Sequence, residues 1–160
     1  ALYSRRILKI KEEFLYMVGF LVISHGNLAE GIKDSISMIM GEQERFEAIG
    51  LRADTDMEHF SDEIYEAAVR LDDGDGVILF TDMFGASPCN FAAANMSRFL
   101  EESRKVKILT GVNLPMVLEG FIRRMECNDL EEIKDTCLDG GRDGVQDFTA
   151  HCMDLDDEEE

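Results

Sequence analysis

The sequence has few basic residues for its length. Sixteen Lys and Arg stand against 34 Asp and Glu among 160 residues, so the formal net charge is −18 at pH 7. Such a chain is poorly suited to nucleic acid, whose phosphates need a basic face, and it disfavours direct docking on anionic lipid. Two interpretations of the charge remain: it keeps the chain in solution, or it attracts a partner that has a basic docking face.

Metal-binding cysteine spacing, long apolar runs and a secretion signal are also lacking. The four cysteines form no Cys-x-x-Cys pair, so no metal site is expected, and free thiols in the reducing cytoplasm are the expected case. No apolar run is long enough to span a membrane. Residues 1–15 hold neither a long apolar core nor a small-residue cleavage site. We expect a cytoplasmic protein with no cofactor.

The length fits one domain, which we place at residues 17–152. Lys11-Glu12-Glu13 can be encoded by a ribosome-binding sequence just upstream of Met17. We therefore expect Met17 to be the natural start and residues 1–16 to be a non-native leader. Residues 153–160 are nearly all acidic and are expected to form a mobile tail.

Apolar runs and amphipathic stretches alternate along the chain. The expected strands are 17–24, 46–51, 76–82 and 105–110, and helices are expected to begin near residues 28, 57, 87, 115 and 130. Gly140, Gly141 and Gly144 are expected to break the fifth helix, and residues 145–152 to form a last, weaker strand. This alternation predicts a doubly wound α/β domain with a mainly parallel sheet and right-handed crossovers.

The predicted topology brings several polar residues to one place. In open parallel sheets, ligands bind beyond the carboxyl ends of the strands, where the strand order reverses. With strand order 2-1-3-4, that point lies between the first and third strands. His25 ends the first strand, the turn from Asp82 to Ser87 follows the third, and Asn113 follows the fourth. We expect these residues to face one crevice.

A histidine and an aspartate in such a crevice can form a nucleophile. Asp82 would accept the proton of Nδ1, fix the ring tautomer and leave Nε2 of His25 free to attack. A phosphoryl group is the natural electrophile, because helices beginning near Leu28 and Pro88 would direct amides and positive dipole ends at it. No basic side chain is evident in these turns, so backbone amides are expected to bind the anion.

Small residues in the same turns would let the backbone approach a phosphate. Gly26 follows the histidine, and Ala86 precedes Ser87, which adds a hydroxyl and a backbone donor. Each candidate also has a structural interpretation. His25 would cap a strand end, Asp82 would cap a turn or helix, Ser87 would be an ordinary helix N-cap and Asn113 a plain turn residue.

Three segments carry a family resemblance over residues 17–152. They are Ile23-Ser24-His25-Gly26 before a helix, the run Thr81-Asp82-Met83-Phe84-Gly85-Ala86-Ser87-Pro88-Cys89-Asn90, and Thr110-Gly111-Val112-Asn113-Leu114-Pro115-Met116. Together they resemble the enzyme IIA component of the bacterial phosphoenolpyruvate-dependent sugar phosphotransferase system, of the mannose/fructose/sorbose family.

The resemblance implies a phosphotransferase with a phosphohistidine intermediate. His25 would accept phosphate from the phosphocarrier protein HPr and pass it to enzyme IIB for sugar uptake, while Asp82 orients the ring. Gly26, Ala86, Ser87 and Asn113 would line the phosphate site. The family is a homodimer that exchanges its C-terminal strand, and it meets the membrane only indirectly, through the permease subunits.

Three alternatives remain open. A phosphotransferase subunit that feeds dihydroxyacetone kinase uses the same chemistry with another acceptor. A serine hydrolase could use Ser87, His25 and Asp82, although the turn lacks the second glycine of a G-x-S-x-G elbow. A purely regulatory module would carry the phosphorylated histidine without passing the phosphate on.

Overall fold

The computed structural model describes residues 17–150. Strands and helices alternate along them, and the predicted leader at 1–16 and acidic tail at 153–160 lie outside the described residues. The elements are β1 (Gly19–His25), α2 (Leu28–Met40), β2 (Phe46–Leu51), α3 (Met57–Leu71), β3 (Val77–Thr81), α4 (Ser87–Ala94), α5 (Met96–Glu101), β4 (Val106–Thr110), α6 (Leu114–Arg124) and α7 (Leu130–Asp143). None of these described helices has the length and apolar character that a membrane span requires.

The four strands form one parallel sheet in the order β2-β1-β3-β4, which confirms the predicted topology. The register pairs His25 with Leu51 and Ile23 with Thr81, and Thr81 in turn pairs with Thr110. The carboxyl ends of all four strands therefore lie along one edge. The predicted first strand ended at residue 24, but β1 extends one residue further. His25 is therefore the last residue of the strand and does not lie in the turn.

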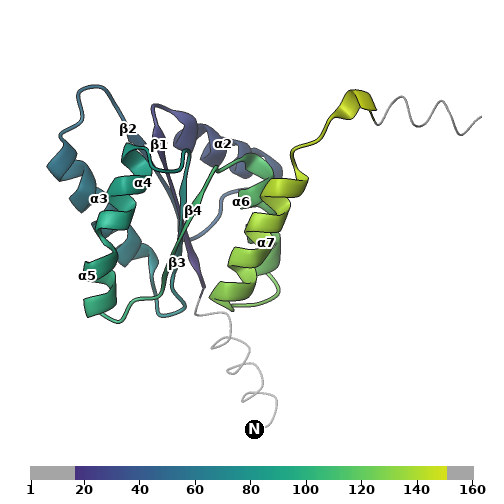
Figure 1. Cartoon of the computed structure of the whole chain (residues 1–160). Coiled ribbons are helices and arrows are strands. Elements are labelled where there is room, and N and C mark those ends of the chain that lie inside the picture. The colour runs from purple at the N-terminus through teal and green to yellow at the C-terminus, as the bar shows by residue number, and fades with distance from the viewer. Residues whose placement is uncertain (1–16, 151–160) are drawn as a thin grey trace, which may run out of the picture.

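Helices cover both faces of the sheet (Figure 1), so the strands are buried on each side. Phe20 and Val22 pack in a core with α2, α6 and α7, while Leu21 and Ile23 pack in a second core with α3 and α5. A strand buried on both faces needs apolar side chains at every position, which explains its unbroken apolar run. The same run carries the chain to an exposed histidine at the sheet edge.

The predicted end of the last helix at Gly144 is confirmed, but the break predicted at Gly140 and Gly141 is wrong, because α7 continues through both glycines to Asp143. These glycines let α7 pack closely on α6. A Cβ on Gly140 would lie 2.5 Å from Cγ of Glu119, and one on Gly141 would lie 2.7 Å from Cε of Met116. The missing side chains serve close helix packing here and do not end the helix.

The strand predicted at 145–152 is not formed in the part of this segment that the structure describes. Residues 145–147 have no regular structure and 148–150 form a short helical turn. Figure 1 shows the segment leaving the body of the domain after α7. Val145 and Phe148 are 76% and 77% exposed, and within the described residues β4 pairs with β3 alone. The described part of the segment pairs with no strand, and the outer edge of β4 is open.

Arg124 fixes the start of the sheet from inside the protein. It is only 7% exposed, its guanidinium donates to the carbonyls of Val18 and Glu44, and it lies over the rings of Phe20 and Phe121. Burial lowers the pKa of Arg124 to about 10, so the side chain is charged at neutral pH. The guanidinium therefore links the residue before β1 to the loop before β2.

We therefore expect Arg124→Ala to lower the free energy of unfolding by about 3 kcal/mol, because two carbonyls lose their buried donor. Urea unfolding measures this effect. Arg123→Ala, which removes a neighbouring arginine that pairs with Glu126 and Glu132 at the surface, is the matched control and should leave stability close to wild type. Equal losses in both variants would contradict the role given to Arg124.

Candidate histidine–aspartate site

Asp82 holds His25 by two hydrogen bonds to the same carboxylate oxygen. Oδ2 of Asp82 accepts from the His25 backbone N–H at 2.7 Å and lies 2.8 Å from Nδ1 of the ring. The histidine side chain is 49% exposed and the aspartate side chain 12%. The structure thus brings together the two residues at the ends of β1 and β3, with the imidazole facing outward.

The charge of Asp82 decides which nitrogen of His25 carries the proton. Burial by itself would raise the pKa of Asp82, but the backbone N–H and ring of His25 outweigh it, so the pKa lies below its usual value. At neutral pH the carboxylate is ionised and can only accept hydrogen bonds. Nδ1 must then carry the proton and donate the hydrogen bond. In the neutral ring, Nε2 is therefore the nitrogen with the free lone pair.

The turn after His25 is held from beneath by Ser24. Its side chain is fully buried, and Oγ accepts from the backbone N–H of Ala29 at 2.7 Å in the first turn of α2. Gly26 has φ +54°, a left-handed conformation that favours glycine, and its N–H donates to the carbonyl of Leu51. The β1–β2 ladder therefore continues one residue past the histidine.

Two helices begin at this edge without a side-chain cap from their own N-cap residue. The N-caps of α2 and α4 are Asn27 and Ala86, and neither side chain bonds the amides of its helix. By contrast, α3, α6 and α7 are capped by Asp56, Asn113 and Asp129. Within the described residues, the first amides of these two helices have no side-chain acceptor, apart from the N–H of Ala29, which bonds to Ser24 Oγ. Free amides at a helix N-terminus are the arrangement an anion requires.

Ser87 and Asn113 occupy different settings. Ser87 is the first residue of α4 and not its N-cap, because Ala86 holds that position. Asn113 caps α6 by accepting from the N–H of Met116, and its amide donates to the carbonyl of Gly141 in α7. Both groups of the Asn113 side chain are therefore engaged, Oδ1 in capping α6 and the amide nitrogen in joining α6 to α7. A part of Asn113 in phosphate binding stays a prediction.

Arg52 is a residue that the sequence pattern did not indicate. It follows β2 directly, and its guanidinium donates to Oδ1 of Asn27 at 2.5 Å and to Oε1 of Glu30 at 3.2 Å. The turns after β1 and β3 hold no basic residue, but the adjacent strand supplies one. The register could have revealed it, since Leu51 pairs with His25 and Arg52 comes next.

Gly50 lets this edge close tightly. A Cβ at this position would lie 2.2 Å from the carbonyl oxygen of Gly26 and 3.0 Å from Oε1 of Glu30. The turn behind His25 therefore rests directly on the β2 backbone. Gly50 is paired with Ser24 in the sheet, one residue before the histidine.

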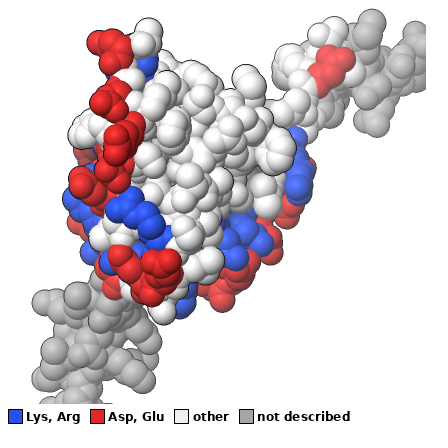
Figure 2. Space-filling view, turned by 60° about the vertical axis from the view of Figure 1, so that its left-hand side comes forward, with Lys and Arg blue, Asp and Glu red and all other residues white. Residues whose placement is uncertain are grey.

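The outer rim of the site is apolar. Met83 and Phe84 follow Asp82 in the turn and are 60% and 84% exposed, and helix α4 beyond them contains no charged residue. Figure 2 shows a face whose centre is free of charged side chains, with acidic residues gathered along its left border. In so acidic a chain, an uncharged face is suited to contact with another protein surface.

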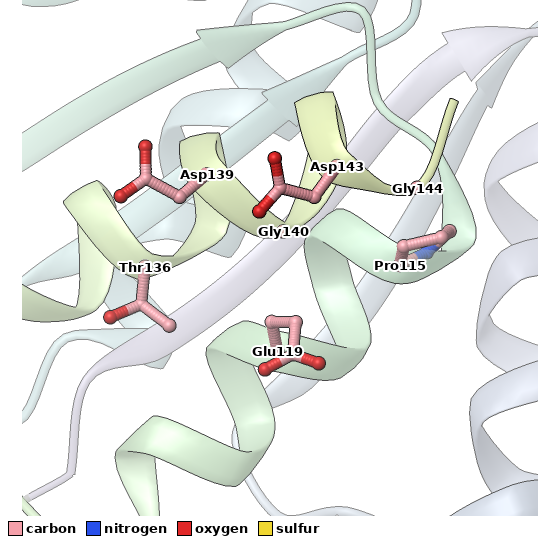
Figure 3. Close-up of a pocket in the computed structure, with 7 residues that line it drawn as sticks. All are labelled: Pro115, Glu119, Thr136, Asp139, Gly140, Asp143 and Gly144. Carbon is pink, nitrogen blue, oxygen red and sulfur yellow. The ribbon is translucent and has the colours of Figure 1, made fainter. Parts of the chain in front are cut away.

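A cavity of about 510 Å³ lies elsewhere, between α6 and α7. Figure 3 shows the residues around it, which are Pro115, Glu119, Thr136, Asp139, Gly140, Asp143 and Gly144. None of its lining residues belongs to the turns after β1 and β3. Within residues 17–150, no group of three or more His, Cys, Asp and Glu side chains could hold a metal ion.

The fold and the site define a class: an open, doubly wound α/β domain with an aspartate-bound histidine between two helix N-termini. Residues 19–138 match the family model EIIA-man, described as the PTS system fructose IIA component. The chain belongs to this family, the enzyme IIA components of the mannose, fructose and sorbose type, which confirms the resemblance drawn from the three motifs.

The names of related proteins agree with the family assignment. The chain is 28% identical over 137 residues to the PTS system mannose-specific EIIAB component of Escherichia coli K12, covering 83% of this chain and 40% of that protein. The chain thus spans less than half the length of that relative. It is 27% identical over 103 residues to the PTS system fructose-specific EIIA component of Bacillus subtilis, covering 64% of this chain and 68% of the relative.

Solved structures share the fold along almost their whole length. The phosphotransferase system component EIIA from Streptococcus agalactiae superposes with a TM-score of 0.75 and 25% identity, covering 84% of this chain and 99% of that one. The PTS IIA protein associated with the fucose utilization operon of Streptococcus pneumoniae gives a TM-score of 0.71 and 30% identity, covering 86% and 97%.

We predict that Gly50→Ala lowers the free energy of unfolding by about 2 kcal/mol or more, because the added methyl displaces the Gly26 carbonyl. The Nδ1–H proton resonance of His25 should shift in the same variant, since the histidine turn moves. Gly31→Ala is the control: nothing lies within 4 Å of a Cβ there, so this change inside α2 should be neutral or slightly stabilising. A Gly50→Ala protein with wild-type stability and resonance would refute the close packing.

Proposed function

We propose that this protein is a phosphocarrier in which His25 accepts a phosphoryl group from phospho-HPr and passes it to an enzyme IIB. The observation that supports this most directly is the pair of hydrogen bonds from His25 to Oδ2 of Asp82. The carboxylate keeps the proton on Nδ1 and stabilises positive charge on the ring, as in other histidine-based sites. Nε2 is then the atom that takes the phosphoryl group.

The transfer exchanges one N–P bond for another. Nε2 of His25 attacks the phosphorus of the donor's phosphohistidine, a new N–P bond forms and the N–P bond to HPr breaks. The ring of His25 gains positive charge, which Asp82 offsets. In the second transfer the acceptor attacks the phosphorus, the N–P bond to His25 breaks and the ring loses its added positive charge. Because bonds of similar kind are exchanged, the site has to hold the phosphoryl group without trapping it.

Backbone amides supply the anion site in this proposal. The starts of α2 and α4, whose own N-cap side chains bond no amide, flank the histidine, and Gly26, Ala86 and Ser87 lie at these starts. Helix N-termini attract anions through their free N–H groups and dipoles. Held by amides and without a dedicated lysine or arginine, the phosphoryl group stays transferable.

The names of the relatives indicate sugar uptake, with mannose, fructose and sorbose as their substrates. We propose the same system for this chain, acting in the cytoplasm and reaching the membrane only through the permease subunits. A subunit that feeds dihydroxyacetone kinase uses the same histidine chemistry, and no contact described above favours it. For a serine hydrolase, Ser87 Oγ would bond to the imidazole, and within the described residues no such hydrogen bond is present.

A homodimer with exchanged C-terminal segments completes the proposal. Residues 145–150 leave the body with Val145 and Phe148 exposed, while the outer edge of β4 is open. A second copy would present its own segment to that edge, pairing its backbone groups and burying the side chain of Phe148. Each segment would then form the strand that a single chain cannot form.

We predict one acid-labile phosphoryl group on the wild-type protein after incubation with phosphoenolpyruvate, enzyme I and HPr, and none on His25→Ala, as measured by intact mass. Asp82→Asn should fold but be phosphorylated about 100-fold or more slowly, because the amide no longer fixes the tautomer or offsets ring charge. A folded wild type that takes no phosphate would refute the phosphocarrier function. Near-normal kinetics in Asp82→Asn would refute the role of the carboxylate.

For the dimer, Phe148→Asp should raise the dissociation constant at least about tenfold, since a charge would have to be buried at the interface. Sedimentation velocity over a concentration series measures this. Thr149→Asp is the control, because a strand directs adjacent side chains to opposite faces. A monomeric wild type at all concentrations, or equal weakening by both changes, would contradict strand exchange.

A further inference from the structure

Arg52 and Glu30 form an ion pair at the back of the histidine turn. Glu30 lies in the first turn of α2, and its Oε1 accepts from Nη2 of Arg52 at 3.2 Å. Nη1 of the same guanidinium donates to Oδ1 of Asn27, two residues after His25. The backbone of Arg52 is itself fixed, because Thr55 bonds to both its N–H and its carbonyl.

The Glu30 carboxylate is held against the sheet edge. Both of its oxygens lie about 3 Å from the Cβ position of Gly50, whose neighbour in the sheet is Ser24. Oε2 is buried and has no hydrogen-bond partner among the described residues. This carboxylate therefore depends on Arg52 for the neutralisation of its charge.

The charge of Glu30 has opposite consequences for the helix and for the phosphoryl group. A carboxylate in the first turn of a helix stabilises the helix by interacting with its dipole. The same carboxylate repels an incoming phosphoryl group, which carries about two negative charges. The N-terminus of α2 thus gains stability from Glu30 and loses attraction for the anion, unless a cation cancels the field.

We propose that Arg52 is a positioning residue that shields the phosphoryl site from Glu30. This inference rests on the proposed phosphocarrier function. The guanidinium acts through Glu30 and Asn27, which it contacts, and not by touching the reacting atoms. With Arg52 in place the pair is neutral, so the open amides of α2 keep their positive potential toward the histidine.

The experiment is a charge cycle on the rate at which phospho-HPr phosphorylates the full chain. Arg52→Ala leaves Glu30 unneutralised, and the rate should fall about three- to tenfold at low salt. This loss of rate should become smaller at about 0.5 M added salt, because salt screens the charge of Glu30. The double variant Arg52→Ala/Glu30→Gln restores a neutral pair of positions and should recover a rate near wild type.

Arg70→Ala is the matched control, because it removes the same charge from another arginine–glutamate pair. Arg70 bonds to Glu47, which lies at the start of β2, away from the carboxyl edge. Its rate should stay near wild type. Urea unfolding of all variants separates a rate effect from loss of fold.

Three results would overturn the shielding role: an unchanged rate in Arg52→Ala, a loss that salt does not reduce, or a double variant as slow as Arg52→Ala. The last result would mean that the guanidinium itself meets the phosphoryl group or the partner protein. A wild type that is not phosphorylated at all fails the phosphocarrier function instead, so the two failures are distinct.

Discussion

The hydrogen bonds between His25 and Asp82 are the constraint on which the rest of the site depends. One carboxylate oxygen holds both the backbone and the ring of the histidine, so the end of β1 is tied to the turn after β3. The bond has this geometry because the two strands are parallel neighbours whose ends lie in register. It also keeps the aspartate ionised, which fixes the tautomer and leaves one ring nitrogen free.

The surrounding edge is arranged to keep this pair accessible yet rigid. Ser24 ties the turn to α2 from the buried side, and Gly50 lets the turn rest on the neighbouring strand. The two helices that start beside the histidine have no side-chain cap from their own N-cap residue, although others in the same fold have one. The proposed anion site would thus consist of backbone amides in an acidic chain, with Arg52 offsetting the nearby carboxylate.

Much of the fold followed from the sequence, because the signals were local and repeated. Continuous apolar runs such as the one before His25 can be satisfied only by strands covered on both faces, and their alternation with amphipathic helices implies a parallel order. That order also brings His25 and Asp82 together without any contact information. Arg52 was missed because its importance depends on the β1–β2 register and not on any motif around it.

Two other errors have physical causes that a single sequence does not show. Gly140 and Gly141 look like helix breakers, yet their lack of side chains serves the close approach of α7 to α6, a tertiary effect. The strand expected at 145–152 needs a partner strand, and residues 145–150 pair with none, although the outer edge of β4 is open. In both cases the prediction rested on the local pattern, whereas the outcome depends on which segment packs against it.

The most direct test of this account is to determine which atom carries the phosphoryl group, by ³¹P and ¹⁵N NMR of the phosphorylated protein with labelled histidine. The account predicts a single phosphoryl group on Nε2 of His25, with Nδ1 still protonated and coupled to the Asp82 carboxylate. Phosphorus on Nδ1, or on the hydroxyl of Ser87, would contradict the view that the His25–Asp82 hydrogen bond selects the nucleophile.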